Sequence, residues 1–329
     1  FARSCGIDVI VTDHHSMLPE LPSALAVVHP TKGEYPNKDL CGAGVAFMLV
    51  RAFLQKYGKE FEIKEGWEKW LLDLVGFATL ADMVPLTGEN RVLASYGLTV
   101  MRKTKRLGLR TLFAKNNIYM EKLTEQDLTF SIAPRLNAAS RMDTPMIAFD
   151  LLTAEDHVIA EKSAKRLEEV NNERKLLVAR IVKEAHSQLD RRELKEIVVI
   201  GNIEWRPAVL GLVANKLQDT YNKSFFVWGG NGGELLKGSC RMLSIHHASL
   251  IFQALPEGVL VEAGGHQAAG GFSVAKEKVH FLEQELNDAI SRTKETEVAE
   301  TDMEAIDMSI GIATSRHYQV LRKFGPFGV

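Results

Sequence analysis

One uninterrupted stretch constrains the fold more than any other: between Thr153 and Arg191 the chain contains neither glycine nor proline. Apolar residues recur there at about 3.5-residue spacing, and charged residues fill the other face of the expected helix. The apolar set is Leu167, Val170, Val178, Ile181, Ala185 and Leu189. Such a segment predicts a helix of roughly 35 residues, about 50 Å long. A surface helix of one domain is the simpler interpretation, but the length and the charge favour a connector between two lobes.

The composition is that of an ordinary globular chain and excludes several classes of protein. With 329 residues, and about 150 residues per domain, two domains are expected. The formal net charge of -2 excludes a globally basic chain, so any nucleic acid must be bound by a local groove. No apolar run approaches the ~20 residues of a membrane span, so no membrane partner is expected. The three cysteines are too scattered for a disulfide framework or a thiolate zinc site, which favours a reducing, cytoplasmic setting.

The residue pattern differs on the two sides of the long helix. Before it, a buried strand is expected at 7–12, helices at 42–57 and 67–84, and an irregular segment with two prolines at 124–146. After it, short apolar runs alternate with helical segments, which predicts a second, smaller α/β domain. The sequence therefore predicts an α/β protein of two lobes, the first with a parallel sheet, joined by the long helix. The expected boundaries are 1–152 for the first domain, 153–191 for the helix, 192–292 for the second domain, and 293–329 for a linker and the start of a further unit.

Asp13, His14 and His15 stand together at the carboxyl end of the strand expected at 7–12. That edge of an open α/β sheet collects ligands, and imidazole with carboxylate suits transition metals such as Mn, Fe, Zn or Co. Successive side chains of a strand point to opposite faces, so one histidine would bind a metal and the other would serve the substrate or the ligand shell. A hydrogen-bonded cluster without a metal is the alternative. The second pair, His246-His247, has no acid nearby and is interpreted as structural.

Two further segments before the long helix carry candidate side chains. Asp82 ends an apolar segment, where a carboxylate is costly unless it is paired or holds a cation; capping of a helix or pairing with an arginine is the alternative. Arg135, Asn137 and Arg141 lie in the segment expected to be irregular. Two guanidinium forks and an amide suit the recognition of an oxyanion such as phosphate. An ordinary ion-paired loop is the alternative there.

The second domain offers two weaker signals. Ser239 and Arg241 are two positions apart on an expected strand, so their hydroxyl and guanidinium groups lie on the same side of it. Gly264 and Gly265 precede His266 in a loop of small residues, where backbone N–H groups can approach an anion closely. This loop has neither the lysine of a P-loop nor the spacing of a dinucleotide fingerprint.

Taken in order, these segments resemble the DHH phosphoesterase family with its DHH-associated C-terminal domain, and within it the RecJ-type exonucleases specific for single-stranded DNA. The resemblance covers essentially the whole chain. The segments that carry it are Val9 to His15, Leu40 to Phe47, Thr79 to Leu86, Glu89 to Arg91, Ala133 to Arg141, Asn171 to Arg174, Gly238 to Arg241, Gly264 to Gly271 and Pro326 to Gly328.

The resemblance implies a hydrolase that uses two metal ions, Mn²⁺ or Mg²⁺, to cleave phosphodiester bonds. It implies that His14 and Asp82 bind one shared metal, with Asp13 orienting the cluster, and that His15 faces the bridging water or the scissile phosphate. It implies that Arg141, with Asn137, stabilises the charge of the transition state, and that Ser239 and Arg241 bind the terminal 5′ phosphate. It also implies that His266, with Gly264 and Gly265, closes over the scissile phosphate, so that His15, Arg141 and His266 are the catalytic candidates.

The resemblance also implies single-stranded DNA as the substrate, degradation from the 5′ end, and a place in DNA repair and recombination. A helicase or a single-strand-binding protein is the partner that it implies. Two alternatives stay open. One is a DHH-family oligoribonuclease or nucleotide phosphatase that acts on short substrates. The other is a degenerate module that binds nucleic acid without catalysis.

The chain departs from the family pattern at its beginning. The family has a D-x-D pair and a further aspartate on strands before the DHH strand, whereas only Phe1 to Thr12 precede Asp13 here. The last residues, Pro326 to Gly328, resemble the entry to an oligonucleotide-binding (OB) domain. We therefore expect a fragment of a longer nuclease, and we expect the 329-residue chain alone to bind metal poorly and to be nearly inactive.

Overall fold

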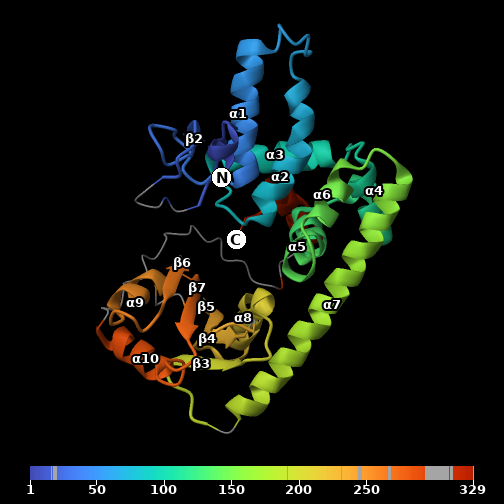
Figure 1. Cartoon of the computed structure of the whole chain (residues 1–329). Coiled ribbons are helices and arrows are strands. Elements are labelled where there is room, and N and C mark those ends of the chain that lie inside the picture. The colour runs from blue at the N-terminus through green and yellow to red at the C-terminus, as the bar shows by residue number, and fades with distance from the viewer. Residues whose placement is uncertain are drawn as a thin grey trace. The chain divides into compact units, whose positions relative to one another are not determined.

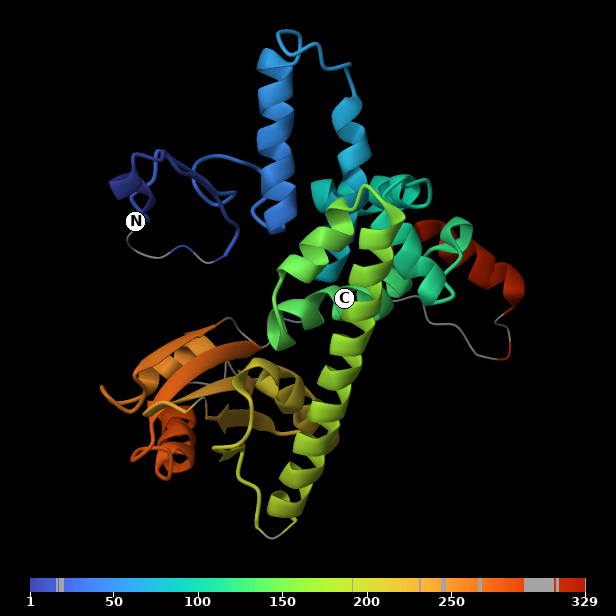
Figure 2. The ribbon, with the colours of Figure 1, turned by 45° about the vertical axis from the view of Figure 1, so that its right-hand side comes forward.

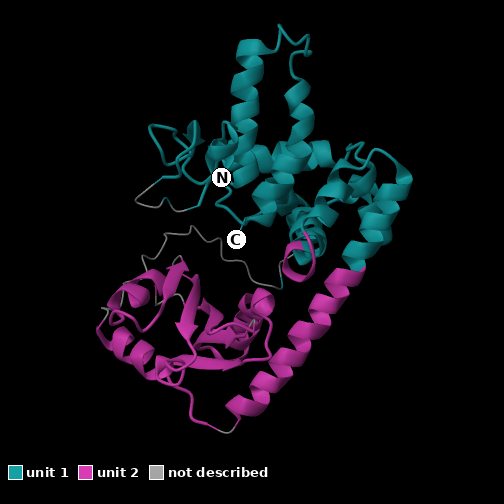
Figure 3. Cartoon of the chain, in the orientation of Figure 1, with its two compact units in different colours: residues 1–139, 145–168, 307–329 teal, residues 140–144, 169–306 magenta. Residues whose placement is uncertain are grey.

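The computed structural model describes residues 1–15, 17, 21–190, 192–230, 232–243, 247–265, 268–292, 311 and 314–328. The chain forms two compact units (Figure 3). Unit 1 comprises Phe1–Ala139, Pro145–Glu168 and Asp307–Val329, and unit 2 comprises Ser140–Thr144 and Glu169–Ile306. The long helix α7 (His157–Leu189) belongs in part to each unit and runs without a break (Figures 1 and 2). The expected α/β class, the two lobes and the connecting helix are confirmed.

Unit 1 is mainly helical, with a small parallel sheet near the beginning of the chain. Strands β1 (Ile10–Thr12) and β2 (Ala26–Val28) pair in parallel, with Thr12 opposite Val28. The α-helices follow as α1 (Gly42–Tyr57), α2 (Leu72–Ala81), α3 (Gly88–Met101), α4 (Leu107–Lys115), α5 (Ala133–Met142), α6 (Met146–Thr153) and, near the end of the chain, α11 (Ser315–Leu321). Short 3-10 or π turns lie at Ala2–Cys5, Trp67–Leu71, Met120–Lys122, Asp127–Ile132 and Arg322–Phe324.

Helices α2 and α3 cross through two glycines. A Cβ atom at Gly76 would lie 2.5 Å from the Cα of Gly97, and one at Gly97 would lie 2.4 Å from the Cα of Gly76. The backbones therefore touch where any larger residue would force the helices apart. This close crossing fixes the axis of α2, which ends at Asp82.

Unit 2 is built on a mixed five-stranded sheet of order β3-β4-β5-β7-β6. Strand β3 pairs with β4 in parallel, and the other neighbours are antiparallel. The strands are β3 (Ile197–Asn202), β4 (Ser224–Gly229), β5 (Leu235–Arg241), β6 (Glu262–Gly265) and β7 (Ala269–Ala275). The helices are α8 (Leu210–Tyr221), α9 (Ala248–Ala254) and α10 (Leu282–Arg292), with a 3-10 turn at Pro207–Val209. Separate clusters of buried apolar residues pack within this unit, one of them including residues of α7.

The structure corrects the expectation of an irregular segment at 124–146. That segment contains the π turn Asp127–Ile132, helix α5 and the start of α6. Its two prolines do not interrupt helices: Pro134 lies inside a continuous helical run, directly after the π segment and Ala133, and Pro145 is the N-cap of α6. At the start of α6, proline is tolerated because its missing N–H would have no partner there. Pro134 instead follows a π-helical segment, where the hydrogen-bond register differs from that of an α-helix. The helix expected at 67–84 is likewise divided, into a 3-10 turn at Trp67–Leu71 and helix α2.

The sequence predicts that the last residues begin a further unit. In the structure, the last described residues pack on unit 1 instead. Arg91 of α3 donates hydrogen bonds to the backbone carbonyls of Phe324 and Pro326. The backbone N–H of Phe327 donates to Glu125 Oε1 at 3.3 Å. These contacts hold the segment against α3 and the loop before the π turn. No helix in the described part of the chain is long and apolar enough to cross a membrane.

Candidate functional site

The Asp13–His15 loop begins at the carboxyl end of β1, as the sequence predicts, although the strand covers Ile10–Thr12 rather than 7–12 and is not buried. The backbone N–H of Asp13 donates to the carbonyl of Val28 at 3.1 Å, which continues the β1–β2 ladder by one step. The Asp13 Oδ1 atom then accepts three hydrogen bonds: from the N–H of His14 at 2.8 Å, from the N–H of His15 at 3.3 Å and from His15 Nδ1 at 2.8 Å. The carboxylate of Asp13 thus folds back on the loop and fixes its turn.

These hydrogen bonds set the charge state of Asp13. The bond from the His15 side chain, followed by the two backbone N–H groups, lowers the pKa of Asp13 to about 2. The carboxylate is therefore ionised at neutral pH and can only accept, so His15 Nδ1 carries the proton. In the neutral imidazole the lone pair then lies on Nε2 of His15, the nitrogen that is left for chemistry.

His14 is brought to Asp82, and this is the long-range contact on which the metal hypothesis depends. The Nδ1 atom of His14 lies 3.6 Å from Oδ2 of Asp82, and their side chains are 22% and 43% exposed. Gly42, the first residue of α1, lies against the ring: a Cβ atom there would be 3.4 Å from His14 Cδ2. An imidazole and a carboxylate thus stand at the ends of β1 and α2, half open to solvent.

Helix α2 ends at Asp82 because the next residue leaves the helical region. Met83 has φ +57°, a left-handed conformation that is rare for a residue with a side chain. Met83 thus takes the place usually given to glycine after the last helical turn. Such local strain is typical of segments that present functional groups.

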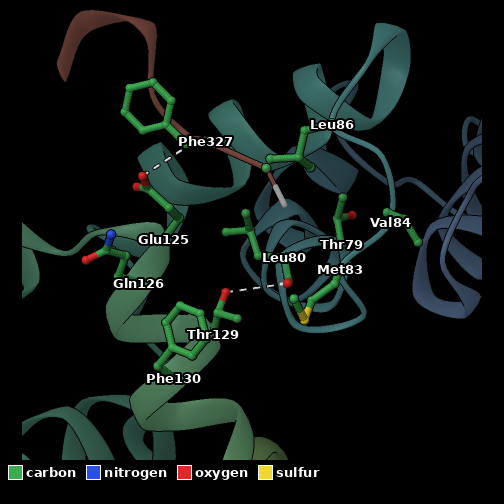
Figure 4. A pocket seen from close by; sticks show the side chains of 11 residues that line it. Thr79, Leu80, Met83, Val84, Leu86, Glu125, Gln126, Thr129, Phe130 and Phe327 are labelled. Carbon is green, nitrogen blue, oxygen red and sulfur yellow. Dashed lines mark hydrogen bonds between the residues drawn. The ribbon is translucent and has the colours of Figure 1, made fainter. Parts of the chain in front are cut away.

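A hollow lies beside the end of α2 (Figure 4). Its walls come from 79–86, from the π turn and from the segment after α11, and Thr129 Oγ1 donates to the carbonyl of Leu80 at 3.4 Å across it. The lining residues are Thr79, Leu80, Met83, Val84, Leu86, Glu125, Gln126, Thr129, Phe130, Phe327 and Gly328. Asp82 is not among them, so the hollow and the His14–Asp82 pair are separate features of this end of α2.

The donor atoms for a metal are incomplete in the described residues. Among them, no group of three or more histidine, cysteine, aspartate or glutamate side chains converges as a metal site would require. His14 and Asp82 converge as a pair, and Asp13 is turned toward His15 and the backbone. The structure thus brings together two of the three metal candidates, and it gives the third an orienting contact.

His29 is a residue that the sequence analysis missed. It directly follows β2 and is 7% exposed, and its Nε2 atom lies 2.7 Å from the carbonyl oxygen of His15. A proline, Pro30, follows His29 directly and is typical of a loop. The usable signal was that His29 follows a second apolar run, as Asp13 follows the first, so both lie at the same edge of a parallel pair.

In unit 2, Ser239 and Arg241 lie on one face of β5, as their spacing predicts. The first turn of α8 faces them: a Cβ atom at Gly211 would be 3.1 Å from Ser239 Oγ and 3.3 Å from Arg241 Nη2. Burial lowers the pKa of the Arg241 guanidinium, and the positive charge of Arg141 lowers it further. A hydroxyl and two guanidinium groups therefore gather beside a glycine at a helix N-terminus, an arrangement that favours an anion.

The other predicted phosphate contacts have different outcomes. Arg141 belongs to unit 2, where it donates to the carbonyl of Ala208 at 3.3 Å, whereas Asn137 lies exposed on the part of α5 that belongs to unit 1. Arg135 is used structurally, since its Nε atom lies 2.6 Å from Glu168 Oε2. Gly264 and Gly265 lie on β6, paired with Gly271 and Gly270. His266 lies outside the described residues.

Two family models match the chain. The model described as "DHH family, N-terminal domain" matches residues 1–79, and the model described as "DHHA1 domain" matches residues 193–292. The first match contains the Asp13–His15 loop, and the second contains β5 and the glycine pair of β6.

Similar proteins and structures agree with these matches. The single-stranded-DNA-specific exonuclease RecJ of Bacillus subtilis is 35% identical over all of this chain and 41% of its own length, and that of Escherichia coli is 31% identical over 99% of this chain and 60% of its own length. The crystal structure of RecJ from Thermus thermophilus in complex with Mn²⁺ superposes with a TM-score of 0.83 at 28% identity, covering 99% of this chain and 47% of that one. This chain thus spans 41% to 60% of the two curated relatives. The chain belongs to the DHH family, and within it to the RecJ type.

Proposed function

We propose that this chain is the nuclease part of a metal-dependent hydrolase that degrades single-stranded DNA from its 5′ end. The observation that carries the proposal is the pairing of His14 with Asp82 at 3.6 Å. The relatives named above are exonucleases specific for single-stranded DNA, and the similarity extends through both units. A role in DNA repair and recombination follows from the same similarity.

We infer that His14 and Asp82 hold one divalent cation, Mn²⁺ or Mg²⁺. An imidazole nitrogen and a carboxylate oxygen are a donor set that fits Mn²⁺, and both side chains are partly open to solvent. A two-metal centre, which we propose for the full-length protein, would neutralise phosphate charge and lower the pKa of a water molecule. Because only two donors converge among the residues that the structure describes, we expect this chain alone to bind the cation weakly and to hydrolyse DNA slowly.

His15 is proposed to act on the scissile phosphate or on the attacking water. Its Nδ1–H is held by the ionised Asp13, so its Nε2 atom can accept a proton or a hydrogen bond. Asp13 is accordingly proposed as the residue that orients His15 rather than as a primary metal ligand. His266, with Gly264 and Gly265, remains a proposed phosphate contact on the ground of the family resemblance.

Ser239, Arg241 and Arg141 are proposed to bind the 5′-terminal phosphate. A doubly charged phosphate would be bound by two guanidinium groups and a hydroxyl, and Gly211 leaves room beside them. The substitution Arg241→Gln removes one guanidinium group and its positive charge but keeps a polar side chain. The control Lys216→Gln removes a charge from the exposed side of α8 in the same unit.

A binding experiment with labelled oligonucleotides tests this assignment directly. Wild-type protein should bind a 5′-phosphorylated single strand more tightly than the same strand with a 5′-hydroxyl. Arg241→Gln should abolish that preference, and Lys216→Gln should keep it. Equal affinity of the wild type for both strands contradicts the assignment of this site.

The length of the substrate separates the remaining alternatives. Release of products from a long single strand with Mn²⁺ supports the exonuclease, whereas hydrolysis of dinucleotides alone supports an oligoribonuclease. Binding without Mn²⁺-dependent hydrolysis in the full-length protein supports a non-catalytic module. A helicase or a single-strand-binding protein is the proposed partner, and co-purification of either with the full-length protein is the test. The free thiols of Cys5, Cys41 and Cys240 fit the proposed reducing, cytoplasmic setting.

A further inference from the structure

A buried histidine lies next to the Asp13–His15 loop without being part of it. β1 and β2 run in parallel with Thr12 opposite Val28. The residues that follow the two strands therefore emerge at the same edge of the sheet, and His29 lies beside the loop. His29 is 7% exposed, and a buried imidazole needs partners for both ring nitrogens.

The hydrogen bonds of His29 fix its tautomer. Its Nδ1 atom accepts from the backbone N–H of Thr31 at 3.2 Å and lies 2.8 Å from Thr31 Oγ1. Because a backbone N–H can only donate, Nδ1 carries the lone pair and the proton lies on Nε2. That Nε2–H donates to the carbonyl oxygen of His15 at 2.7 Å.

His15 is consequently held at two points. Its imidazole is fixed by Asp13, through the 2.8 Å contact of Nδ1 with Oδ1. Its backbone is fixed at the carbonyl by His29, and its N–H also donates to Asp13 Oδ1 at 3.3 Å. Its side chain is 74% exposed, and its ring centroid lies 4.5 Å from that of His14. These hydrogen bonds and this ring contact together define where the His15 ring points.

We propose that His29 is a positioning residue, which holds the backbone of His15 so that the His15 ring stays on Asp13 and its Nε2 atom stays directed at the reacting groups. The inference rests on the proposed function, because it concerns the residue assigned there to the phosphate or the water. In this proposal His29 contacts His15 and takes no part in proton transfer. Residues of this kind act through the groups that they orient.

The test is ¹⁵N NMR of the histidine side chains of the metal-free chain, with His15 identified through His15→Asn. In the wild type, His15 should show a protonated Nδ1 and an unprotonated Nε2. His29→Leu and His29→Phe remove the donor, and the two nitrogen signals of His15 should move toward the averaged position of a freely exchanging ring. His29→Asn keeps a donor and an acceptor and should keep the wild-type signals.

The controls separate positioning from general damage. Thr31→Val keeps the backbone N–H that fixes the His29 tautomer, and His317→Phe removes an exposed ring of the same unit; both should leave His15 unchanged. His29→Phe keeps the ring volume, so the test stands if His29→Leu fails to fold. Signals of His15 that stay in place in His29→Phe, or that move equally in His29→Asn, overturn the proposal.

Addition of Mn²⁺ to the wild type makes failure of the proposed function distinguishable. Paramagnetic broadening of the His14 signals reports the proposed metal pair and does not depend on His29. Absence of broadening, together with a His15 shift in His29→Phe, rejects the metal site and leaves the positioning contact established. Broadening without any His15 shift rejects the role of His29 alone.

Discussion

The Nδ1 atom of His14 lies 3.6 Å from the Oδ2 atom of Asp82, although α1 and α2 separate them along the chain. His14 reaches this point because β1 ends one residue earlier than Asp13. Asp82 reaches it because α2 crosses α3 through Gly76 and Gly97 and then stops at a left-handed Met83. The pair is thus the product of strand register and helix crossing together.

The glycine crossing should be intolerant of a single methyl group. Gly97→Ala places a Cβ atom 2.4 Å from the Cα of Gly76 and 2.8 Å from the carbonyl oxygen of Leu72, so the helices must separate. We expect a loss of about 2–3 kcal/mol of stability in urea unfolding. The control Gly271→Ala meets its nearest atom at 3.9 Å and should unfold within about 1 kcal/mol of the wild type, since Gly and Ala differ little where no atoms collide. A urea midpoint in Gly97→Ala equal to that of the wild type contradicts the close contact of α2 and α3 at Gly76 and Gly97.

Asp73 should be the most sensitive carboxylate of unit 1. It is 3% exposed and accepts from Thr104 Oγ1 at 2.8 Å and Arg106 Nε at 2.9 Å. Asp73→Ala leaves these donors without a partner, which should cost about 3 kcal/mol. Glu161→Ala removes a partly exposed pair with Lys115 and should cost less than about 1 kcal/mol. Thermal unfolding measures the loss of stability in each variant. Similar losses in the two variants would show that burial does not determine how much these ion pairs contribute to stability.

The three thiols should differ in reactivity. Burial raises the pKa of Cys240 to about 12 and also raises that of Cys41, whereas Cys5 is exposed. Because the thiolate is the reactive form, only Cys5 should react rapidly with a disulfide reagent at pH 8. Keeping the Cys240 thiol protonated in the folded state also contributes to the stability of the fold. This contribution is fully present below about pH 9, the ordinary pKa of a thiol, and is lost as the pH rises toward 12. Rapid modification of two thiols in the folded chain would contradict the burial of Cys240 or Cys41.

Gly211→Ala should separate stability from phosphate binding. Alanine favours a helix by up to about 1 kcal/mol over glycine, and the new Cβ atom lies 3.1 Å from Ser239 Oγ and 3.3 Å from Arg241 Nη2. The melting temperature should therefore stay close to that of the wild type. The preference for a 5′-phosphorylated strand should fall about tenfold, which corresponds to ~1.4 kcal/mol. A preference that survives this substitution would place the terminal phosphate elsewhere.

The sequence was sufficient where local chemistry decides. Periodicity alone predicts the helix at 42–57, the long helix and the placement of Ser239 and Arg241 on one face of a strand. The structure shows all three. The error at 124–146 came from reading Pro134 and Pro145 as breakers. Pro145 stands at the start of α6, where proline costs little, and Pro134 follows a π-helical segment within a continuous helical run.

What the sequence could not supply are the contacts made by tertiary packing. No spacing rule places Gly211 against Arg241, because α8 and β5 meet only in the folded unit. The contact of His29 with the His15 carbonyl depends on the register of β1 and β2, which two short strands do not reveal. The proximity of His14 and Asp82 was implied by the family resemblance and by nothing in their separation along the chain.

The most direct test of the central claim is the broadening of histidine NMR signals by substoichiometric Mn²⁺, which detects even weak binding. The wild type should lose the His14 signals first, Asp82→Asn should protect them, and Asp39→Asn, which neutralises an exposed carboxylate outside the pair, should behave as the wild type. Broadening that is equal in Asp82→Asn, or that falls first on a histidine outside the Asp13–His15 loop, would contradict a metal site shared by His14 and Asp82.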